Sequence, residues 1–562
     1  DLGVPAVDFS FVDQPDLQPP PIVENPAKWD TVEAQGFYDL DATGQPRAIR
    51  SDLTGTLTGM VQFGQSHTVD PAGNAAKNHP TLVAERSALL LFTPSVTGIE
   101  QLKVVVTVNG VKKGTLNLLH PNEQFRSDYA NADGRTDLVY SRQAWTAVLP
   151  WDWVVGGMAL SFEDQQQRSG SLAASKIELA APGEIVFQSL RLGMLTDPPQ
   201  SGDAYWLNSP AKAAADYFQT IPAARLVAGT YDDMMLTQAI VGNGTIYSTA
   251  STQNGDVYTG DLREDVAKSQ VSAGINLANM GIPSAPMSQQ NPHLFVQMTI
   301  HLAAGNYANG VQVHGLSGGN GAITLLDAVG NEFSHEVGHA YGLGHYPGYD
   351  STAVPNLQYF WSAHHADSGW GFITYRKRMR ANVHWRWDGT GTDVNGVKSD
   401  RAFQKIYSYN RDAMSSGEVV SSLSRFTHYT GYSTYTRIQN WLNRPVPDAT
   451  VASGYRRWNP ATQRMEPYSF PASDNRLAPT KVGVPVYTLL GGYDPLGNAL
   501  INPVFRGNYG NVFNLPEPST DLNQRACYME ITFGDGSIKR VALADTRYTA
   551  AIINQFQINI EQ

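Results

Sequence analysis

The sequence predicts a multidomain chain with an N-terminal β-sandwich-like region, a central α+β domain and a C-terminal β-rich region. Its 562 residues correspond to about three or four domains. Short strand-like runs between turn residues dominate before residue 200, helical patterns follow, and strand patterns then return. We expect an extended N-terminal arm over residues 1–50, a β-sandwich-like domain over 51–198, the central domain over 199–450 and the C-terminal region over 451–562.

The composition excludes several broad classes of protein. Hydrophobic residues make up 42% and charged residues 16%, so the chain is not globally disordered. The net charge of -11 supplies no basic field, and we expect no nucleic-acid partner. No apolar run approaches the roughly 18 residues of a membrane-spanning segment. Because Cys527 is the single cysteine, an intrachain disulfide and a cysteine-built zinc site are excluded.

The compartment is not fixed by these features. The chain begins at Asp1, without a methionine or an apolar signal-like segment. We interpret it as a processed or trimmed form in which an export signal would be out of view. Low cysteine use fits both a cytosolic protein and an exported bacterial one.

The region before residue 200 is predicted to form strands joined by tight turns. Prolines 15 and 19–21 indicate that the arm is extended. Residues 102–108 and 111–118 flank Asn109-Gly110, the pattern of a hairpin with a type I′ turn. Further strand-like runs cover 87–92, 158–162, 177–180 and 185–195, and turn residues at 196–202 suggest a domain boundary.

The central region alternates helices with short strands. Ser209 and Pro210 predict a helix start, and Asp261 with Glu264 resembles a capping box before a second helix. Three further elements complete the prediction: a strand and a glycine-rich loop over 308–321, a helix over about 325–341, and a hairpin turn at 533–536. The loop lacks the lysine and the serine or threonine of a phosphate-binding loop, which argues against nucleotide binding.

The residues expected to perform the chemistry lie in one segment, His335-Glu336-Val337-Gly338-His339-Ala340-Tyr341-Gly342-Leu343-Gly344-His345. On a helix, His335 and His339 project from one face and can reach one zinc ion. Gly342 can take a left-handed conformation that ends the helix, so that the chain turns back and His345 supplies a third nitrogen. Three protein ligands leave a fourth position for water, which is typical of catalytic rather than structural zinc. The alternative is an exposed histidine-rich helix.

This extended motif resembles that of the metzincin metalloproteases. Such enzymes also have a downstream methionine in a tight turn beneath the zinc, and Met414 within residues 411–417 is the candidate. By itself, a methionine in a turn of small residues is unremarkable. The 69 residues between His345 and Met414 form a long insertion, which we expect to build substrate-binding loops.

The flanking sequence is similar to the M66 peptidase family, which includes StcE-like mucin-cleaving proteases of Gram-negative bacteria. The similarity rests on Tyr217-Phe218-Gln219-Thr220-Ile221-Pro222, on Gly305-Asn306-Tyr307-Ala308-Asn309-Gly310 and on Gly330-Asn331-Glu332-Phe333-Ser334. It extends to the β-rich region before residue 200 and to residues 484–486 and 493–495. The resemblance implies a metzincin-type central domain in a secreted bacterial zinc endopeptidase. It also implies O-glycosylated, Ser/Thr-rich, mucin-like proteins as substrates, and we expect a monomer.

The expected reaction is metal-assisted peptide hydrolysis. Zinc would lower the pKa of its water toward about 7 and polarise the scissile carbonyl. Glu336 would take a proton from that water and later deliver it to the leaving amine. Two alternatives remain open: a general metzincin protease without glycan dependence, and a non-catalytic glycan-binding adhesin on the same scaffold.

Three aromatic residues are candidate substrate contacts. Tyr346 follows the third ligand and either contacts substrate or packs against the zinc loop. Trp370 either meets sugar faces or packs in the interior, as tryptophan commonly does. Val257-Tyr258 stands where we associate a Trp-His pair with mucin-cleaving relatives, and Tyr258 could still stack on a sugar. The pair His364-His365, with Trp361 nearby, is either a second metal site or an exposed loop.

Overall fold

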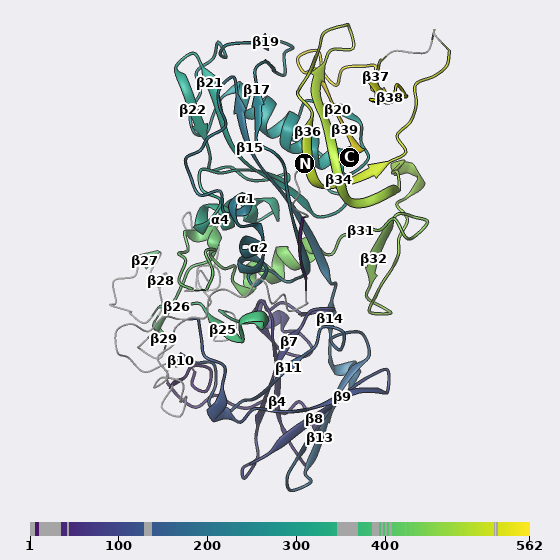
Figure 1. The fold of residues 1–562 in the computed structure, drawn as a ribbon. Coiled ribbons are helices and arrows are strands. Elements are labelled where there is room, and N and C mark those ends of the chain that lie inside the picture. Colours follow the sequence, from purple (N-terminus) through teal and green to yellow (C-terminus); the bar gives the residue numbers. More distant parts are fainter. Residues whose placement is uncertain are drawn as a thin grey trace.

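The computed structural model describes most of the chain. The residues described are 6–10, 35–41, 44–128, 138–345, 369–384, 393–394, 397–398, 402–403, 407–421, 423–521, 523 and 527–562. Three β-rich regions are visible in Figure 1: a sandwich at the bottom, a central sheet and its helices above the sandwich, and a C-terminal sheet at the upper right. Within the described residues, no helix is long and apolar enough to cross a membrane.

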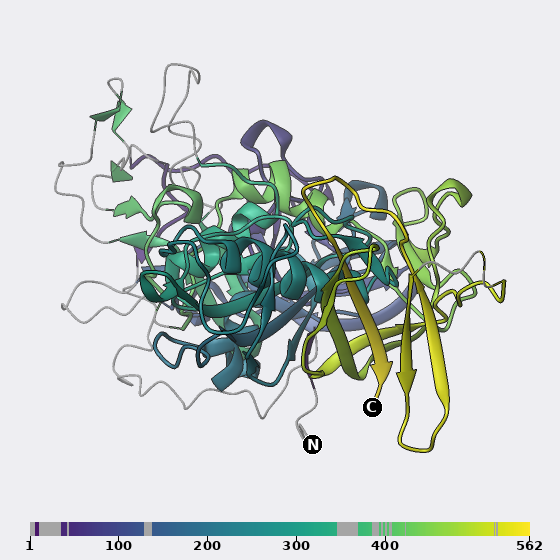
Figure 2. The same cartoon turned by 90° about the horizontal axis from the view of Figure 1, so that it is seen from above.

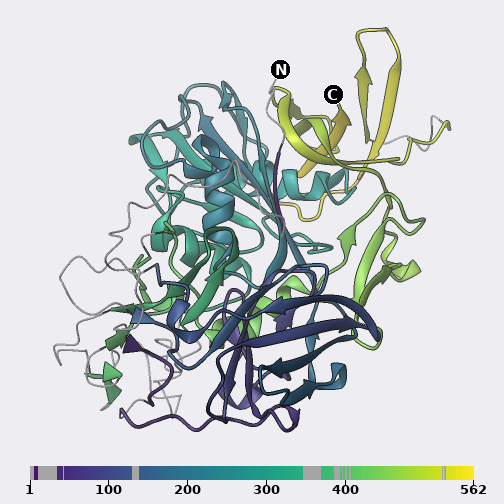
Figure 3. The same cartoon turned by 60° about the horizontal axis from the view of Figure 1, so that its bottom comes forward.

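The N-terminal region folds as two facing antiparallel sheets, which Figure 3 brings forward. Apolar side chains from both sheets share one buried core, and the rings of Phe92 and Phe162 stack with centroids 4.7 Å apart. This arrangement agrees with the predicted β-sandwich. One sheet contains β11 (Trp145–Leu149), β7 (Ala88–Pro94), β4 (Gly59–Gly64) and β5 (Thr68–Val69); the other contains β3 (Thr54–Gly55), β13 (Ser169–Leu172), β12 (Met158–Asp164), β8 (Leu102–Val108) and β9 (Val111–Asn117).

The hairpin predicted around Asn109 and Gly110 is confirmed. Strands β8 and β9 pair antiparallel on either side of these two residues. Asn109 has φ 50° and Gly110 has φ 78°, the positive values that a type I′ turn requires at both central positions.

The central sheet is mostly parallel and has the strand order β1-β16-β15-β21-β22. Strand β15 pairs in parallel with its neighbours on both sides, and the short β22 lies antiparallel at one edge. The bounds are β1 (Val7–Ser10), β16 (Ala223–Thr230), β15 (Gly183–Met194), β21 (Gln297–Tyr307) and β22 (Gly310–His314), with β17 (Met234–Leu236) on β15 and β23 (Ala322–Thr324) on β21.

Two expected domain boundaries need correction. We assigned the strand-like run 185–195 to the sandwich, whereas β15 is the middle strand of the central sheet. Nearly all its residues are buried, as expected for a parallel strand covered on both faces, so this boundary lies before Gly183 rather than at 198. The N-terminal arm is also not wholly separate, because β1 pairs with β16.

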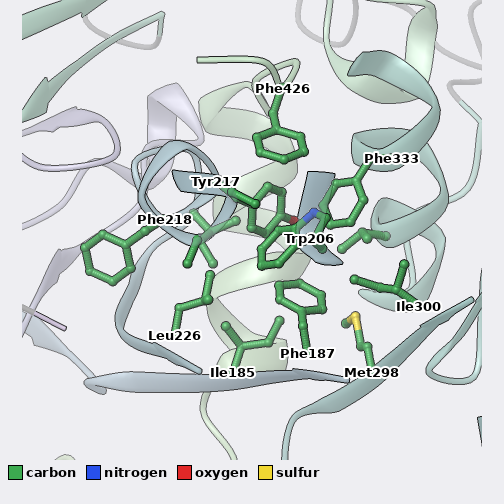
Figure 4. Packing of buried hydrophobic residues seen from close by; sticks show 14 of the residues in the cluster. Ile185, Phe187, Trp206, Tyr217, Phe218, Leu226, Met298, Ile300, Phe333 and Phe426 are labelled. Carbon is green, nitrogen blue, oxygen red and sulfur yellow. The ribbon is translucent and has the colours of Figure 1, made fainter. Parts of the chain in front are cut away.

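Helices cover both faces of the central sheet. Figure 4 shows the core on one face, where Phe187 of β15 meets Trp206, Tyr217 and Phe333 from three different helices. Alternate residues of β15, Leu190 and Leu192, lie in a second core on the other face. The first face is covered by α1 (Tyr205–Asn208), α2 (Pro210–Phe218) and α4 (Gly330–Ala340); the second is covered by a π-helix over Leu262–Ala273 that continues into α3 (Gly274–Ala278).

The predicted helices exist, but two details differ. Helix α4 begins at Gly330, whereas we expected a start near 325. Asp261 caps the second helix by accepting from its own neighbour Leu262 N, while the Glu264 carboxylate pairs with Arg263 and Lys268. The two residues therefore do not form a reciprocal capping box.

The C-terminal region packs beside the central domain, as the view from above in Figure 2 shows. Its sheet recruits β20 from the central part of the chain, so the region is not an isolated module. The predicted turn at 533–536 joins β37 and β38, which pair antiparallel. The strands are β20 (Ser284–Pro286), β39 (Asn554–Glu561), β34 (Pro479–Tyr493), β35 (Ala499–Ile501), β36 (Phe505–Phe513), β37 (Cys527–Thr532), β38 (Ile538–Leu543), β31 (Val446–Pro447), β32 (Tyr455–Asn459) and β33 (Arg464–Pro467).

Short elements connect these regions. They are β2 (Gln35–Gly36), β10 (Leu138–Val139), β6 (Leu82–Val83), β14 (Leu179–Ala180), β18 (Ala239–Ile240), β19 (Ile246–Tyr247), β24 (Trp370–Ile373), β25 (Arg378–Ala381), β26 (Val383–His384), β27 (Asp393–Val394), β28 (Val397–Lys398), β29 (Ala402–Phe403), β30 (Tyr407–Tyr409), α5 (Gly431–Ser433) and α6 (Gln439–Leu442).

Candidate metal centre and catalytic site

Three histidines from one short segment converge. His335 and His339 lie on one face of α4, Gly342 ends the helix with φ 82°, and the returning chain brings in His345. The Nε2 atom of His335 lies 3.2 Å from Nε2 of His339 and 3.0 Å from Nε2 of His345. The geometry expected from the motif is therefore present.

The outer ring nitrogens define the tautomers of two of these histidines. His335 Nδ1 lies 2.9 Å from the Ala413 carbonyl oxygen, and His339 Nδ1 lies 2.9 Å from that of Leu343. A carbonyl can only accept, so both Nδ1 atoms carry the proton and both Nε2 atoms present lone pairs. Burial is the main cause that lowers the pKa of both rings, which favours the neutral form that binds metals.

This donor set fits a zinc ion. Lone pairs that face one another repel unless a cation lies between them. Nitrogen ligands about 2.0–2.1 Å from a tetrahedral zinc lie about 3.3 Å from each other, close to the observed spacing. Among the described residues, this trio is the group of His, Cys, Asp or Glu side chains that could hold a metal ion.

Glu336 lies beside the first ligand and is 6% exposed. Burial raises its pKa to about 7; Glu332 adds to the rise, while Arg263 and Lys268 oppose it. A metal cation nearby would lower this value again. The carboxyl group is thus suited to gaining and losing a proton near neutral pH.

The glycine-rich loop 315–321 lies against α4. A Cβ atom on Gly318 would lie only 1.9 Å from the Glu336 carbonyl oxygen, so this position requires glycine. Glu332 of α4 accepts from Leu326 N at 2.7 Å, and Lys268 donates to Ser317 Oγ at 3.1 Å. The glycines therefore allow a close approach of the loop to the helix.

Met414 lies in a 3₁₀ turn, Ala413–Ser415, beneath the metal-binding helix. Its side chain is buried, and a Cβ atom on Gly338 would lie 2.3 Å from Met414 Sδ. The same turn carries Ala413, whose carbonyl accepts from His335. Met414 therefore packs against the helix that carries His335 and His339, and its role as the methionine of a metzincin-type turn remains a prediction.

Sequence reasoning missed the polar residues that support this turn and α4. Asp412 precedes the turn and accepts from Met414 N at 2.8 Å, an Asx-type pattern that could have been recognised. A buried tyrosine trio links distant segments, because Tyr217 Oη lies 3.0 Å from the hydroxyls of both Tyr341 and Tyr429. Tyr429 in turn donates to Ser334 O of α4. Only the fold reveals the trio.

Of the expected substrate contacts, Tyr258 is exposed. Its loop is held against β22 and the glycine-rich loop, because His314 Nδ1 donates to Asp256 O at 2.8 Å and Gly315 N donates to Val257 O at 3.1 Å. Tyr258 is 59% exposed. A role in substrate binding remains a prediction.

The prediction that Trp370 contacts substrate is wrong. Its side chain is fully buried in a core on the outer face of the sandwich sheet that contains β4 and β7, with its ring centroid 5.4 Å from that of Phe37 and 5.5 Å from that of Tyr140. Packing, the alternative considered for this residue, is what the structure shows. Tyr346, Trp361, His364 and His365 lie outside the described residues.

Comparisons with known proteins agree with this site. The family model of peptidase M66 matches residues 134–446, and that of the ToxR activated gene A lipoprotein domain matches residues 477–562. The ToxR-activated gene A lipoprotein of Vibrio cholerae is 33% identical over 485 residues, covering 84% of this chain and 46% of its own length.

Two further relatives are less similar in sequence to this chain. Metalloprotease StcE of Escherichia coli is 29% identical over 527 residues, covering 75% of this chain and 57% of its own. Dictomallein of Burkholderia mallei is 24% identical over 494 residues, covering 83% and 68%. The chain thus spans about half the length of the first two relatives. Because the M66 model matches more than half of the chain and includes the three histidines and Glu336, this chain belongs to the M66 peptidase family.

Proposed function

We propose that this chain is a zinc-dependent endopeptidase of the metzincin type. The observation that carries the proposal is the convergence of three histidine Nε2 atoms, with the buried Glu336 next in sequence to the first of these histidines. The similarity to a relative named a metalloprotease supports it. These intact groups also argue against a purely glycan-binding adhesin.

Each of these residues would have a distinct role in peptide hydrolysis. His335, His339 and His345 would hold the zinc ion, whose Lewis acidity would polarise the scissile carbonyl and acidify water. Glu336 would take the proton from the attacking water and pass it to the leaving amine. Ala413 O and Leu343 O would keep two of the imidazoles in the metal-binding tautomer.

The substrates proposed are O-glycosylated, mucin-like Ser/Thr-rich proteins, and the proposed setting is outside a bacterial cell, with the chain acting as a monomer. The family membership supports the substrate class. The exposed ring of Tyr258, on a loop fastened beside the glycine-rich loop, supports a sugar or peptide contact near the site.

A general protease without glycan dependence is the second candidate. Val257-Tyr258, in place of the expected Trp-His pair, is the observation that favours it. The test compares cleavage of a defined O-glycosylated peptide with that of its unglycosylated twin, with and without a chelator. Faster, chelator-sensitive cleavage of the glycopeptide is expected. Equal rates would support the second candidate, and the absence of cleavage of either peptide would contradict both.

A further inference from the structure

The turn that carries Met414 is held by one buried carboxylate. Asp412 is fully buried, and its Oδ1 accepts from Met414 N at 2.8 Å. Its Oδ2 accepts from Thr430 N at 2.6 Å and from Ser433 Oγ at 2.8 Å. Asp412 therefore ties the start of the turn to the segment around Thr430, which follows it in sequence by 18 residues.

The next residue in the chain, Ala413, contacts the metal centre. Ala413 N donates to His428 O at 3.1 Å, and Ala413 O accepts from His335 Nδ1 at 2.9 Å. Asn331 of α4, with its amide oriented to suit its neighbours, also donates to Ala413 O at 3.2 Å. The Ala413 peptide is thus fixed on both sides, and its carbonyl points at the first ligand.

A carboxylate suits this position better than an amide. All three partners of Asp412 donate hydrogen bonds, and a carboxylate has only acceptors to offer them. In an asparagine, the NH₂ group would face either Met414 N–H or Thr430 N–H, and neither backbone group can reverse its role. One buried donor would then lose its partner and the turn would shift.

We propose that Asp412 is a positioning residue for the metal centre: it holds the Ala413 carbonyl against His335 Nδ1 and so fixes the direction of His335 Nε2. Groups that orient a metal-binding imidazole through its outer nitrogen typically change metal affinity by about 10- to 100-fold when they are removed. The inference rests on the proposed function in one respect, since it assumes that His335 binds a metal ion.

The test measures metal affinity in the folded protein. Zinc dissociation constants, obtained by competition with a chromophoric chelator, are compared for wild type and Asp412→Asn, and the absorption spectrum of the Co²⁺-loaded proteins reports ligand geometry. We expect Asp412→Asn to weaken zinc binding about 10- to 100-fold and to alter the Co²⁺ spectrum.

Asp164→Asn is the matched control. Asp164 is also a buried aspartate that holds a turn, accepting from Gln166 N and Arg168 N at 2.9 Å, but its turn lies in the sandwich. It should lower thermal stability while leaving zinc affinity within about twofold of wild type. Equal loss of zinc affinity in both variants would reduce Asp412 to a general stabilising role and overturn the proposal.

A milder variant covers the case in which Asp412→Asn does not fold. Ser433→Ala removes one of the three donors and keeps the carboxylate with both backbone partners. It should weaken zinc binding about two- to fivefold. Zinc affinity within error of wild type in every folded variant of this pair would overturn the proposal. Wild type that binds zinc but cleaves no peptide would instead contradict the proposed function, and the affinities would still decide the role of Asp412.

Discussion

The β-sandwich and the candidate metal centre differ in whether their contacts stay within one region of the chain. The strands of the sandwich pair with one another, both neighbours such as β8 and β9 and the distant β3 and β13. At the candidate metal centre the three histidines are close in sequence, but the carbonyl that orients His335 lies 78 residues away, outside their helix. Tyr429 donates from its hydroxyl group to Ser334 O of α4, and its own carbonyl accepts a hydrogen bond from His67 of the sandwich, 362 residues away.

This difference shows that the sandwich contacts the segments around the candidate metal centre and is not a detached module. His67 Nε2 donates to Tyr429 O at 2.9 Å, next to the segment that Asp412 holds. Arg86 of the sandwich donates to Ile221 O and Ala223 O of the central domain. A local sequence motif therefore identifies the candidate ligands. Hydrogen bonds from the neighbouring domain hold the segments that pack around them.

The largest expected effect is a loss of turnover that leaves the fold of the sandwich and of the candidate metal centre unchanged. Glu336→Gln should lower turnover about 10²- to 10⁴-fold while zinc content, measured by elemental analysis, stays at the wild-type level. His339→Ala should lose the metal as well as the activity, because two imidazoles remain. Near-normal hydrolysis by Glu336→Gln would remove Glu336 from the mechanism.

A large stability effect is expected in the sandwich core. Phe92→Ala should reduce the free energy of unfolding by about 3–5 kcal/mol, because a fully buried ring stacked on Phe162 is lost. Zinc affinity of the folded protein should change little, since the metal ligands are elsewhere. Denaturant unfolding and chelator competition measure the two quantities, and a parallel loss of both would show tighter coupling than we infer.

A smaller effect should appear as pH falls. Burial lowers the pKa of His67 to about 3, so the unfolded state binds more protons between pH 6.5 and 3. Stability should therefore fall as pH drops through that window, by up to about 1.4 kcal/mol per pH unit from this group. His67→Gln should flatten this dependence in denaturant unfolding at pH 7, 6 and 5. An unchanged slope would show that His67 makes no contribution.

The smallest effect on stability is expected at Tyr258. Tyr258→Ala should change the free energy of unfolding by less than about 0.5 kcal/mol, because the ring is exposed. It should raise KM for a glycosylated peptide if the ring meets the substrate. An unchanged KM in steady-state kinetics would exclude that contact, and Tyr435→Ala, at another exposed tyrosine, is the control.

Local patterns made much of the molecule predictable. Asn109-Gly110 specified its turn because both residues tolerate positive φ, and Pro210 and Gly342 marked helix ends for equally local reasons. The spacing of His335, His339 and His345 determined their convergence, because helical geometry and one glycine turn suffice to bring them together.

Tertiary structure alone decided the rest. Burial of Trp370 depends on Phe37 and Tyr140 from remote segments, and the residues beside Trp370 do not indicate those partners. The assignment of β15 to the central sheet depends on parallel pairing with β16 and β21, which lie beyond intervening segments. The sequence by itself determined which histidines come together as candidate metal ligands, because that set is short-range. Hydrogen bonds between distant segments decided how those histidines are oriented.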